Sequence, residues 1–294
     1  MGVGYQGLQF ALLAKRRRVD FRRTMTFGRQ NHYLSAELLR SMFSRFGTPL
    51  SAANEKDVLA NDYAEGLFRV LGADVVDSMD ASNYEGATVI HDLNEPIQPS
   101  LVRSYSCVVD FGVLEHIFNV PVALKNATDL LKEGGYFLSQ TTANNFLGHG
   151  FYQFSPELFF NYFSNNGFSD ISVYLIPYRE FPYFFRVTDP RDLAARVELV
   201  NAEPVLIGVM ARKTKHLAKA NPPIQSDYKE RFWRGRDILR KSKVPQADPQ
   251  IAAAMAGLND HIRSLMAWPE RISPDLTYGF DNRAYYRLMD PAKD

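Results

Sequence analysis

The sequence predicts an α/β domain with an open, mostly parallel β-sheet that is covered by helices on both faces. Three observations support this prediction. Strand-like apolar segments alternate with amphipathic helical segments from residue 23 to residue 213. The helical segments end at glycines, which favour the backbone conformation found at helix C-termini. Residues 106–112 are almost continuously apolar, as expected for a central parallel strand buried on both faces.

The order of the elements follows from their end signals and from the spacing of their apolar residues. Ser35 and Ser155 stand in N-cap positions, and Pro156 and Glu157 favour the first turn of a helix. Repeated strand–helix–strand units imply right-handed crossovers between parallel strands, and the last strand of the closing pair is expected to run antiparallel. The expected strands are 23–28, 73–80, 87–93, 106–112, 135–142, 170–176 and 204–212, and the expected helices are 35–47, 62–72, 120–135 and 155–167.

Three regions are expected along the chain. Residues 1–22 form an N-terminal helical segment, and residues 23–213 form the α/β domain. Beyond residue 213 the sequence changes to charged amphipathic segments joined by proline-rich stretches, such as residues 221–223. This change predicts a helical C-terminal extension over residues 214–294, which either packs on the domain or joins copies of the chain in a homo-oligomer.

Composition and charge limit the class of partner. The chain has 34 Lys and Arg residues against 33 Asp and Glu, a net charge of +1, whereas a nucleic-acid binder usually carries a marked basic excess. A small-molecule partner is therefore expected. No apolar run is long enough to span a membrane, and the basic run 15–18 follows the first apolar stretch, unlike in a signal peptide. These features predict a cytoplasmic protein. Cys107, the single cysteine, lies in an apolar strand and is expected in the core.

Residues 73–142 contain three segments in a recognisable order: VVDSMDAS, TVIHDLNEPI and CVVDFGVLEHIFNVPVALKNATDLLKEGGYFL. They resemble the second to fifth strands of the class I S-adenosylmethionine-dependent methyltransferases, which have a Rossmann-like fold. The resemblance implies that S-adenosylmethionine binds at the carboxyl ends of the strands, with Asp80 on the ribose hydroxyls and Asp92 beside the adenine amine. It also places Phe111 and Gly112 beside the cofactor. A carboxylate at a strand end can accept from two hydroxyls, although both aspartates also lie in turn-like sequences.

The first strand departs from the pattern of this family. Its members carry a Gly-rich loop of the form acidic-x-Gly-x-Gly after this strand, whereas here the strand ends TFGRQNHYLS and keeps only Gly28. Two interpretations follow. Gly28 still lets the backbone approach the cofactor while Arg29 or Gln30 contacts the cofactor carboxylate, with Arg29 expected to supply the positive charge, or the site is degenerate and the protein is a catalytically inactive binding or assembly module.

Residues suited to act on a methyl acceptor follow the fourth and fifth strands. The turn GVLEHIFN places Glu115 and His116 beside the expected methyl donor, and His149 lies in a glycine-flanked loop; either histidine can take a proton near neutral pH. The alternative is that the Glu–His pair only shapes the pocket. The residues expected to contact the acceptor are Asn144, Asn145, Tyr152 and Gln153. Turn hydrogen bonds are the alternative role for the two asparagines.

The expected function is that of a methyltransferase that acts on a small molecule or glycan, at oxygen. No metal site is expected, because the 6 histidines show no HxxxH spacing and there is no CxxC pair. The aromatic stretch 178–187 is expected to pack in the core, or alternatively to form part of an acceptor pocket or lid.

Overall fold

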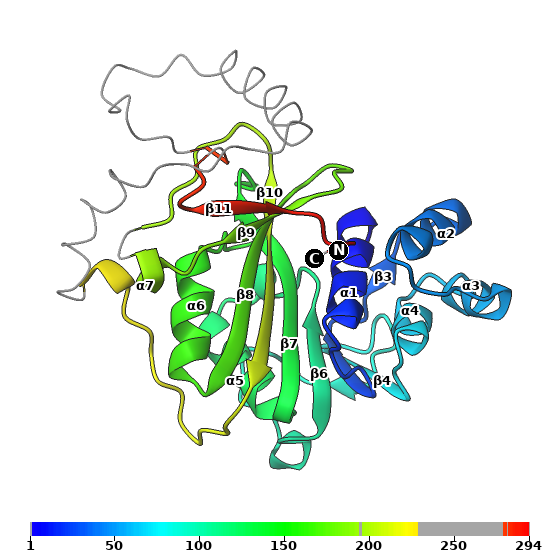
Figure 1. Cartoon of the computed structure of the whole chain (residues 1–294). Helices are drawn as coiled ribbons and strands as arrows, with labels where there is room; N and C mark the ends of the chain where they lie inside the picture. The colour runs from blue at the N-terminus through cyan, green and yellow to red at the C-terminus, as the bar shows by residue number, and fades with distance from the viewer. Residues whose placement is uncertain (1, 194–195, 229–278, 281, 294) are drawn as a thin grey trace.

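The protein folds around one nine-stranded β-sheet, as seen in a computed structural model that describes residues 2–193, 196–228, 279–280 and 282–293 (Figure 1). A separate parallel pair, β1 (Gly2–Val3) and β3 (Asn31–His32), ties the N-terminal segment to the loop after β2. In sheet order the nine strands are β11 (Tyr286–Met289), β9 (Phe184–Val187), β8 (Phe168–Pro177), β10 (Val205–Lys213), β7 (Leu131–Asn144), β6 (Tyr105–Asp110), β2 (Arg23–Phe27), β4 (Val75–Asp80) and β5 (Val89–Ile90).

The pairing directions confirm the predicted fold class. Strands β5, β4, β2, β6 and β7 pair in parallel, which makes one half of the sheet purely parallel. Strand β10 enters between β7 and β8 and is antiparallel to both. It is the last of the strands expected from the sequence, so the prediction of an antiparallel closing strand is also confirmed.

Helices cover both faces of the sheet, and the buried side chains form one core on each face. Side chains alternate along β6, so that Val108 packs into one core while Cys107 and Val109 pack into the other. The helices that contribute to the core of Cys107 are α1 (Tyr5–Arg16), α2 (Ala36–Arg45), α3 (Ala52–Val58) and α4 (Glu65–Val70). Those that contribute to the core of Val108 are α5 (Val120–Leu130) and α6 (Pro156–Asn165).

Helix starts follow the sequence signals closely. The Ser35 and Ser155 side chains accept hydrogen bonds from the backbone N–H groups of Leu38 and Leu158, as N-caps do. Cys107 is completely buried, and burial raises its thiol pKa well above the ordinary value, as expected for a core cysteine and not for a nucleophile.

Some elements were not expected from the sequence. Helix α3 forms in a polar stretch, where Ser51 caps it by accepting from the Asn54 N–H. Strand β9 forms within the aromatic stretch 178–187, and its Phe184 and Phe185 are fully buried, so this part of the stretch packs in the core. The short helices not yet named are α7 (Pro190–Leu193) and the 3₁₀ turns η1 (Pro99–Leu101), η2 (Leu114–His116) and η3 (Ser226–Tyr228).

Both ends of the chain pack against the sheet. Helix α1 lies in the segment expected as a separate N-terminal region, yet its Phe10 ring contacts the rings of Phe111 and Tyr174 in the core. At the other end, β11 pairs antiparallel with β9. The described part of the expected helical extension therefore adds a strand, and the expected helices and homo-oligomer contact fall on residues 229–278, outside the described residues.

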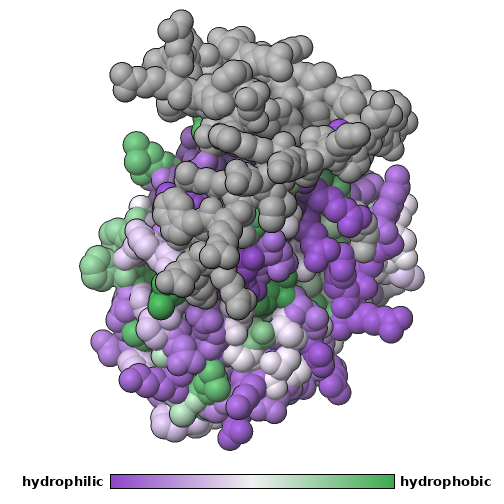
Figure 2. Space-filling view, turned by 60° about the vertical axis from the view of Figure 1, so that its left-hand side comes forward, coloured by the Kyte–Doolittle hydropathy of each residue, from purple (hydrophilic) through white to green (hydrophobic). Residues whose placement is uncertain are grey.

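Hydrophilic residues cover most of the described surface in the view of Figure 2, and hydrophobic residues form separate small areas there. In the described part of the chain, no helix is both long enough and apolar enough to cross a membrane. Large aromatic side chains that do reach the surface include Phe118, Phe151 and Tyr178. All three belong to segments that follow strands β6, β7 and β8.

Candidate active site

A cavity of about 460 Å³ lies where the parallel strands end. Strands β2, β4, β6 and β7 run in the same direction, so their carboxyl ends meet at one edge of the sheet, which is where open α/β sheets bind ligands. The volume is in the range of small-molecule sites, roughly 300–1,000 Å³. The lining includes Phe111, Gly112, Glu115, Gln140, Thr142 and His149, together with Gly2, Gly4, Gln6 and Gly7 of the N-terminal segment.

Gly28 and Asp80 lie side by side at the ends of β2 and β4. Gly28 has a φ of 65°, and a Cβ atom added there would lie 3.1 Å from a Val113 methyl group and 3.9 Å from Oδ2 of Asp80. Oδ1 of Asp80 accepts a 3.3 Å hydrogen bond from the Ser82 N–H. Among the described residues, Oδ2 accepts none. Gly28 thus adopts a positive φ that favours glycine, and it lies beside a carboxylate oxygen that can still accept hydrogen bonds.

In the loop after Gly28, the Arg29 side chain is bonded to its neighbours, whereas the Gln30 side chain has one oxygen without a hydrogen-bond partner among the described residues. Arg29 donates to Glu65 at 2.7 Å and to the Glu85 carbonyl, and its guanidinium lies 3.8 Å from the centre of the Tyr63 ring. Its charge is therefore already balanced, and its expected role toward a cofactor carboxylate stays a prediction. Gln30 is buried and donates to the Phe27 carbonyl, while its Oε1 has no hydrogen-bond partner among the described residues.

Asp92 lies in a tight turn, apart from the cavity lining. Its Oδ1 accepts from both the backbone and the side-chain nitrogen of Asn94, and these bonds lower the pKa of Asp92 below its ordinary value. Phe111 and Gly112, by contrast, line the cavity directly after β6. Of the residues expected to bind the cofactor, Phe111 and Gly112 therefore line the cavity, and Gly28 and Asp80 lie at the adjacent strand ends. Arg29 and Asp92 are instead bonded to other residues of the protein.

Asp110 is a buried residue of this edge that the sequence analysis did not single out. Its Oδ1 accepts from the N–H groups of Val113 and Leu114, and its Oδ2 accepts a 2.6 Å bond from the Ser139 hydroxyl. These bonds fix the turn that carries Glu115. Burial raises the pKa of Asp110, and the nearby Glu115 carboxylate raises it further. The sequence signal that could have identified Asp110 is an aspartate in an apolar strand directly before a turn.

We expect the free energy of unfolding to decrease as pH rises, because of Asp110. A carboxyl whose pKa is higher folded than unfolded binds its proton more tightly in the folded state, so its stabilising effect is lost as pH rises through the folded pKa. In Asp110→Asn, the decrease in the free energy of unfolding between low and high pH should be smaller than in the wild type by about 1 kcal/mol or more. Urea unfolding at about pH 5 and about pH 8 measures it, with the exposed Asp74→Asn as control. Equal pH dependence in wild type and Asp110→Asn would contradict the assignment.

His149, which follows β7, lies close to Glu115 and His116, which follow β6. Glu115 is 1% exposed, and its Oε2 accepts a 2.6 Å bond from the Thr141 hydroxyl while its Oε1 lies 3.7 Å from Nε2 of His149. The rings of His116 and His149 are 5.1 Å apart, edge to face. Burial raises the pKa of Glu115 and lowers that of His116, and His149 lowers the pKa of His116 further. We call these three residues the Glu–His–His cluster.

A glycine holds the His149 loop against Glu115. Gly150 has a φ of 72°, and a Cβ atom there would lie 2.6 Å from the Glu115 carbonyl oxygen, closer than any side chain allows. That carbonyl accepts the N–H groups of Phe151 and Tyr152. The backbone of the loop therefore lies directly on the Glu115 backbone, which explains why the sequence has glycine next to His149.

We expect Gly150→Ala to disrupt this contact. The methyl group cannot fit beside the Glu115 carbonyl at a positive φ, so the loop must move, at a cost of about 1–3 kcal/mol in the free energy of unfolding. Gly148→Ala is the matched control, since an added Cβ atom meets nothing within 4 Å there. Chemical denaturation compares the two variants. If both lose the same stability, the close approach at Gly150 is not what fixes the loop.

The four residues expected to contact the acceptor hold the same loop in place. Asn144 donates to the Asn201 side chain, Asn145 donates to the carbonyls of residues 201 and 203, Gln153 accepts the Phe146 N–H, and Tyr152 donates to the Phe118 carbonyl. The bonds of Asn144, Asn145 and Tyr152 join segments that are distant in the sequence, so they are not the turn hydrogen bonds of the alternative interpretation. Asn144 and Gln153 also line a separate cavity of about 200 Å³. Direct contact of these residues with an acceptor stays a prediction.

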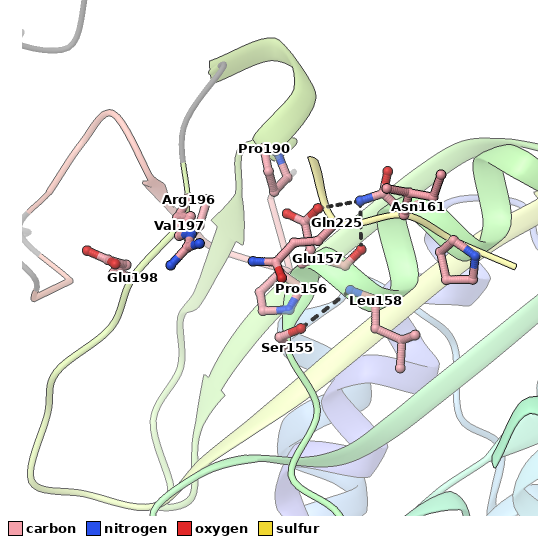
Figure 3. A pocket seen from close by; sticks show the side chains of 12 residues that line it. Ser155, Pro156, Glu157, Leu158, Asn161, Pro190, Arg196, Val197, Glu198 and Gln225 are labelled. Carbon is pink, nitrogen blue, oxygen red and sulfur yellow. Dashed lines mark hydrogen bonds between the residues drawn. The ribbon is translucent and has the colours of Figure 1, made fainter. Parts of the chain in front are cut away.

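A further cavity of about 350 Å³ lies at the start of α6, where Figure 3 shows its side chains. The Ser155 and Glu157 side chains in its wall are already bonded, to the Leu158 N–H and to the Asn161 amide respectively. None of the residues expected to bind cofactor or acceptor lines it. It thus lacks the chemistry that the Glu–His–His cluster brings to the larger cavity.

Comparison with known proteins assigns the chain to a family. The sequence model described as "Methyltransferase domain" matches residues 51–206, more than half of the chain. Among curated proteins, none matches.

Solved structures give distant likenesses. An S-adenosylmethionine-dependent methyltransferase from Thermotoga maritima is 15% identical with a TM-score of 0.33, covering 70% of this chain and 89% of that one. TehB from Haemophilus influenzae is 13% identical with a TM-score of 0.36, covering 69% and 61%. The citrinin polyketide synthase CMeT domain is 13% identical with a TM-score of 0.23; the alignment covers 42% of this chain and only 29% of that one.

The family match carries the assignment, because TM-scores below 0.5 add nothing to it. It spans α3 to the start of β10 and includes β4, β6 and β7, whose carboxyl ends carry Asp80, the Phe111–Gly112 turn and the loop of His149. The family expected from the sequence is therefore confirmed. The chain belongs to the methyltransferase-domain family.

Proposed function

We propose that the protein transfers a methyl group from S-adenosylmethionine to a hydroxyl oxygen of a small molecule or glycan. The observation that carries this proposal is the position of the Glu–His–His cluster. Glu115 and His149 line the same cavity as Phe111 and Gly112, next to the strand ends where Gly28 and Asp80 lie. Groups that assist proton loss and groups suited to a nucleoside thus meet at one edge of the sheet.

The residues present fit the cofactor. Oδ2 of Asp80 is placed to accept from ribose hydroxyls, and Gly28 makes the tight turn beside it without a side chain. The buried Gln30 Oε1, without a partner among the described residues, is a ready acceptor beside Gly28. The single remaining glycine is therefore compatible with binding.

The acceptor is held against the cluster. S-adenosylmethionine supplies a methyl group made electrophilic by its positively charged sulfur. The acceptor oxygen forms the new bond to this carbon as the carbon–sulfur bond breaks and its electron pair stays on sulfur. The Glu–His–His cluster assists loss of the hydroxyl proton, while Tyr33 and Tyr178 in the cavity wall offer flat faces for a planar or sugar ring. The net charge of +1 suits a small, weakly charged acceptor.

Isothermal titration with S-adenosylmethionine and S-adenosylhomocysteine tests the first part of the proposal. We expect one equivalent of each to bind, and a screen of hydroxylated small molecules and sugars should then reveal methyl transfer to oxygen. Binding of neither compound by folded protein would refute the proposed activity and favour a binding or assembly module. Transfer to nitrogen, carbon or sulfur acceptors alone would refute the assignment to oxygen.

A further inference from the structure

The Glu–His–His cluster has the composition of a metal site. It offers one carboxylate oxygen and two imidazole nitrogens, and these ligand atoms all lie within 4.8 Å of one another. Two nitrogens and one oxygen suit divalent transition metals such as Zn²⁺, Mn²⁺, Fe²⁺ and Co²⁺. We propose that Glu115, His116 and His149 bind one such ion. The proposal rests on the proposed function, since it concerns how the same site handles the acceptor.

The distances are close to those of a loaded site. Ligands at about 2.0–2.2 Å from a metal lie roughly 3–3.5 Å from one another. Oε1 of Glu115 and Nε2 of His149 are already 3.7 Å apart. His116 is exposed, so its ring can rotate toward the other two ligands without disturbing the core.

Two buried carboxyl groups lie at the proposed site. Asp110 and Glu115 are 0% and 1% exposed, and they follow one another along the same strand end. Among the described residues, neither forms an ion pair with a lysine or arginine; His149 is the basic side chain nearest to Glu115. Buried carboxylates are costly unless they are paired or coordinate a metal. A divalent ion between Glu115 and the two histidines would pair with the Glu115 carboxylate.

The neighbouring residues hold the ligands in the required orientation. The Thr141 hydroxyl donates to Oε2 of Glu115, which leaves Oε1 directed at His149. The close packing of Gly150 on the Glu115 carbonyl fixes the His149 loop from the other side. Such outer contacts are typical of metal sites, where they orient the ligands and tune their basicity.

An ion at this position would face the cavity, because Glu115 and His149 both line it. Three protein ligands leave coordination positions open, as in catalytic rather than structural metal sites. An ion held by these residues would lower the pKa of an acceptor hydroxyl bound to it, so that the hydroxyl would lose its proton to solvent more readily before its oxygen attacks the methyl carbon. The substrate class is therefore a hydroxylated acceptor that binds through oxygen to a metal.

Titration of the metal-free full-length protein with Co²⁺, followed by its visible absorption, and with Zn²⁺ by calorimetry tests the proposal. We expect one equivalent of each to bind. His149→Ala, Glu115→Gln and the surface variant His116→Ala should each weaken binding about 100-fold or more, and Thr141→Val about 10- to 100-fold. His216→Ala is the control, since this histidine lies beside Lys213 after β10 and should leave binding unchanged.

The outcomes separate this proposal from the proposed function. Wild-type protein that binds S-adenosylhomocysteine but no Co²⁺ or Zn²⁺ overturns the metal site and leaves the methyl transfer standing. The same holds if His149→Ala and His116→Ala, both shown to bind S-adenosylhomocysteine, keep full metal affinity. Metal binding that these variants abolish, in a protein with no affinity for either cofactor compound, supports the metal site and refutes the methyl transfer.

Discussion

Replacing His149 with asparagine should lower the turnover number about 100-fold or more while leaving the affinity for S-adenosylhomocysteine nearly unchanged. His149 lies beside the buried Glu115 in the cavity wall, whereas the groups suited to the ribose are at Gly28 and Asp80. Loss of the imidazole therefore removes help with the acceptor proton but no contact to the cofactor. This holds whether the imidazole acts on the acceptor directly or through a metal ion.

The measurement is steady-state methyl transfer to any acceptor that the wild-type enzyme methylates, together with calorimetry on the same samples. His216→Asn controls for loss of a histidine elsewhere, and His116→Asn, in the same cluster, should lower turnover as well. Full turnover in both His116→Asn and His149→Asn would mean that positioning of the acceptor alone drives the reaction. A parallel loss of cofactor affinity in His149→Asn would place this residue in the cofactor site instead.

The second large effect is expected at Asp80, where replacement by alanine should weaken binding of S-adenosylhomocysteine by about 1–3 kcal/mol. A half-buried carboxylate whose Oδ2 accepts no bond from the described residues is well placed to accept from both ribose hydroxyls. Removing it leaves those hydroxyls without a charged acceptor.

Two further variants make this test specific, both measured by isothermal titration. Asp80→Asn keeps an oxygen for the Ser82 N–H, so it separates loss of charge from loosening of the turn. Asp92→Ala should have a smaller effect, because Oδ1 of Asp92 is already bonded to Asn94. Equal losses in Asp80→Ala and Asp92→Ala would remove the special role of Asp80, and unchanged affinity in both would move the ribose away from these strand ends.

Local sequence signals predicted the parallel half of the fold well. An N-cap serine acts on the helix that it begins, and an apolar run such as residues 106–112 is buried whichever strands flank it, so both can be recognised from neighbouring residues. The same applies to Gly28, where the strand ends. The edge strand β11 escaped prediction because it pairs with β9 across a long stretch of sequence, and pairing partners are not a local property.

The sequence by itself determined the family, the parallel strands and the strand ends at which the candidate site was expected. Only the tertiary structure decided which of these residues meet. It brought His149 to Glu115, because Gly150 packs on the Glu115 carbonyl. It also engaged Arg29 with Glu65, and it bonded Asn144 and Asn145 to the distant Asn201. The physical reason is that a side chain's role depends on its hydrogen-bond partners and its burial, and both are set by segments distant in the sequence.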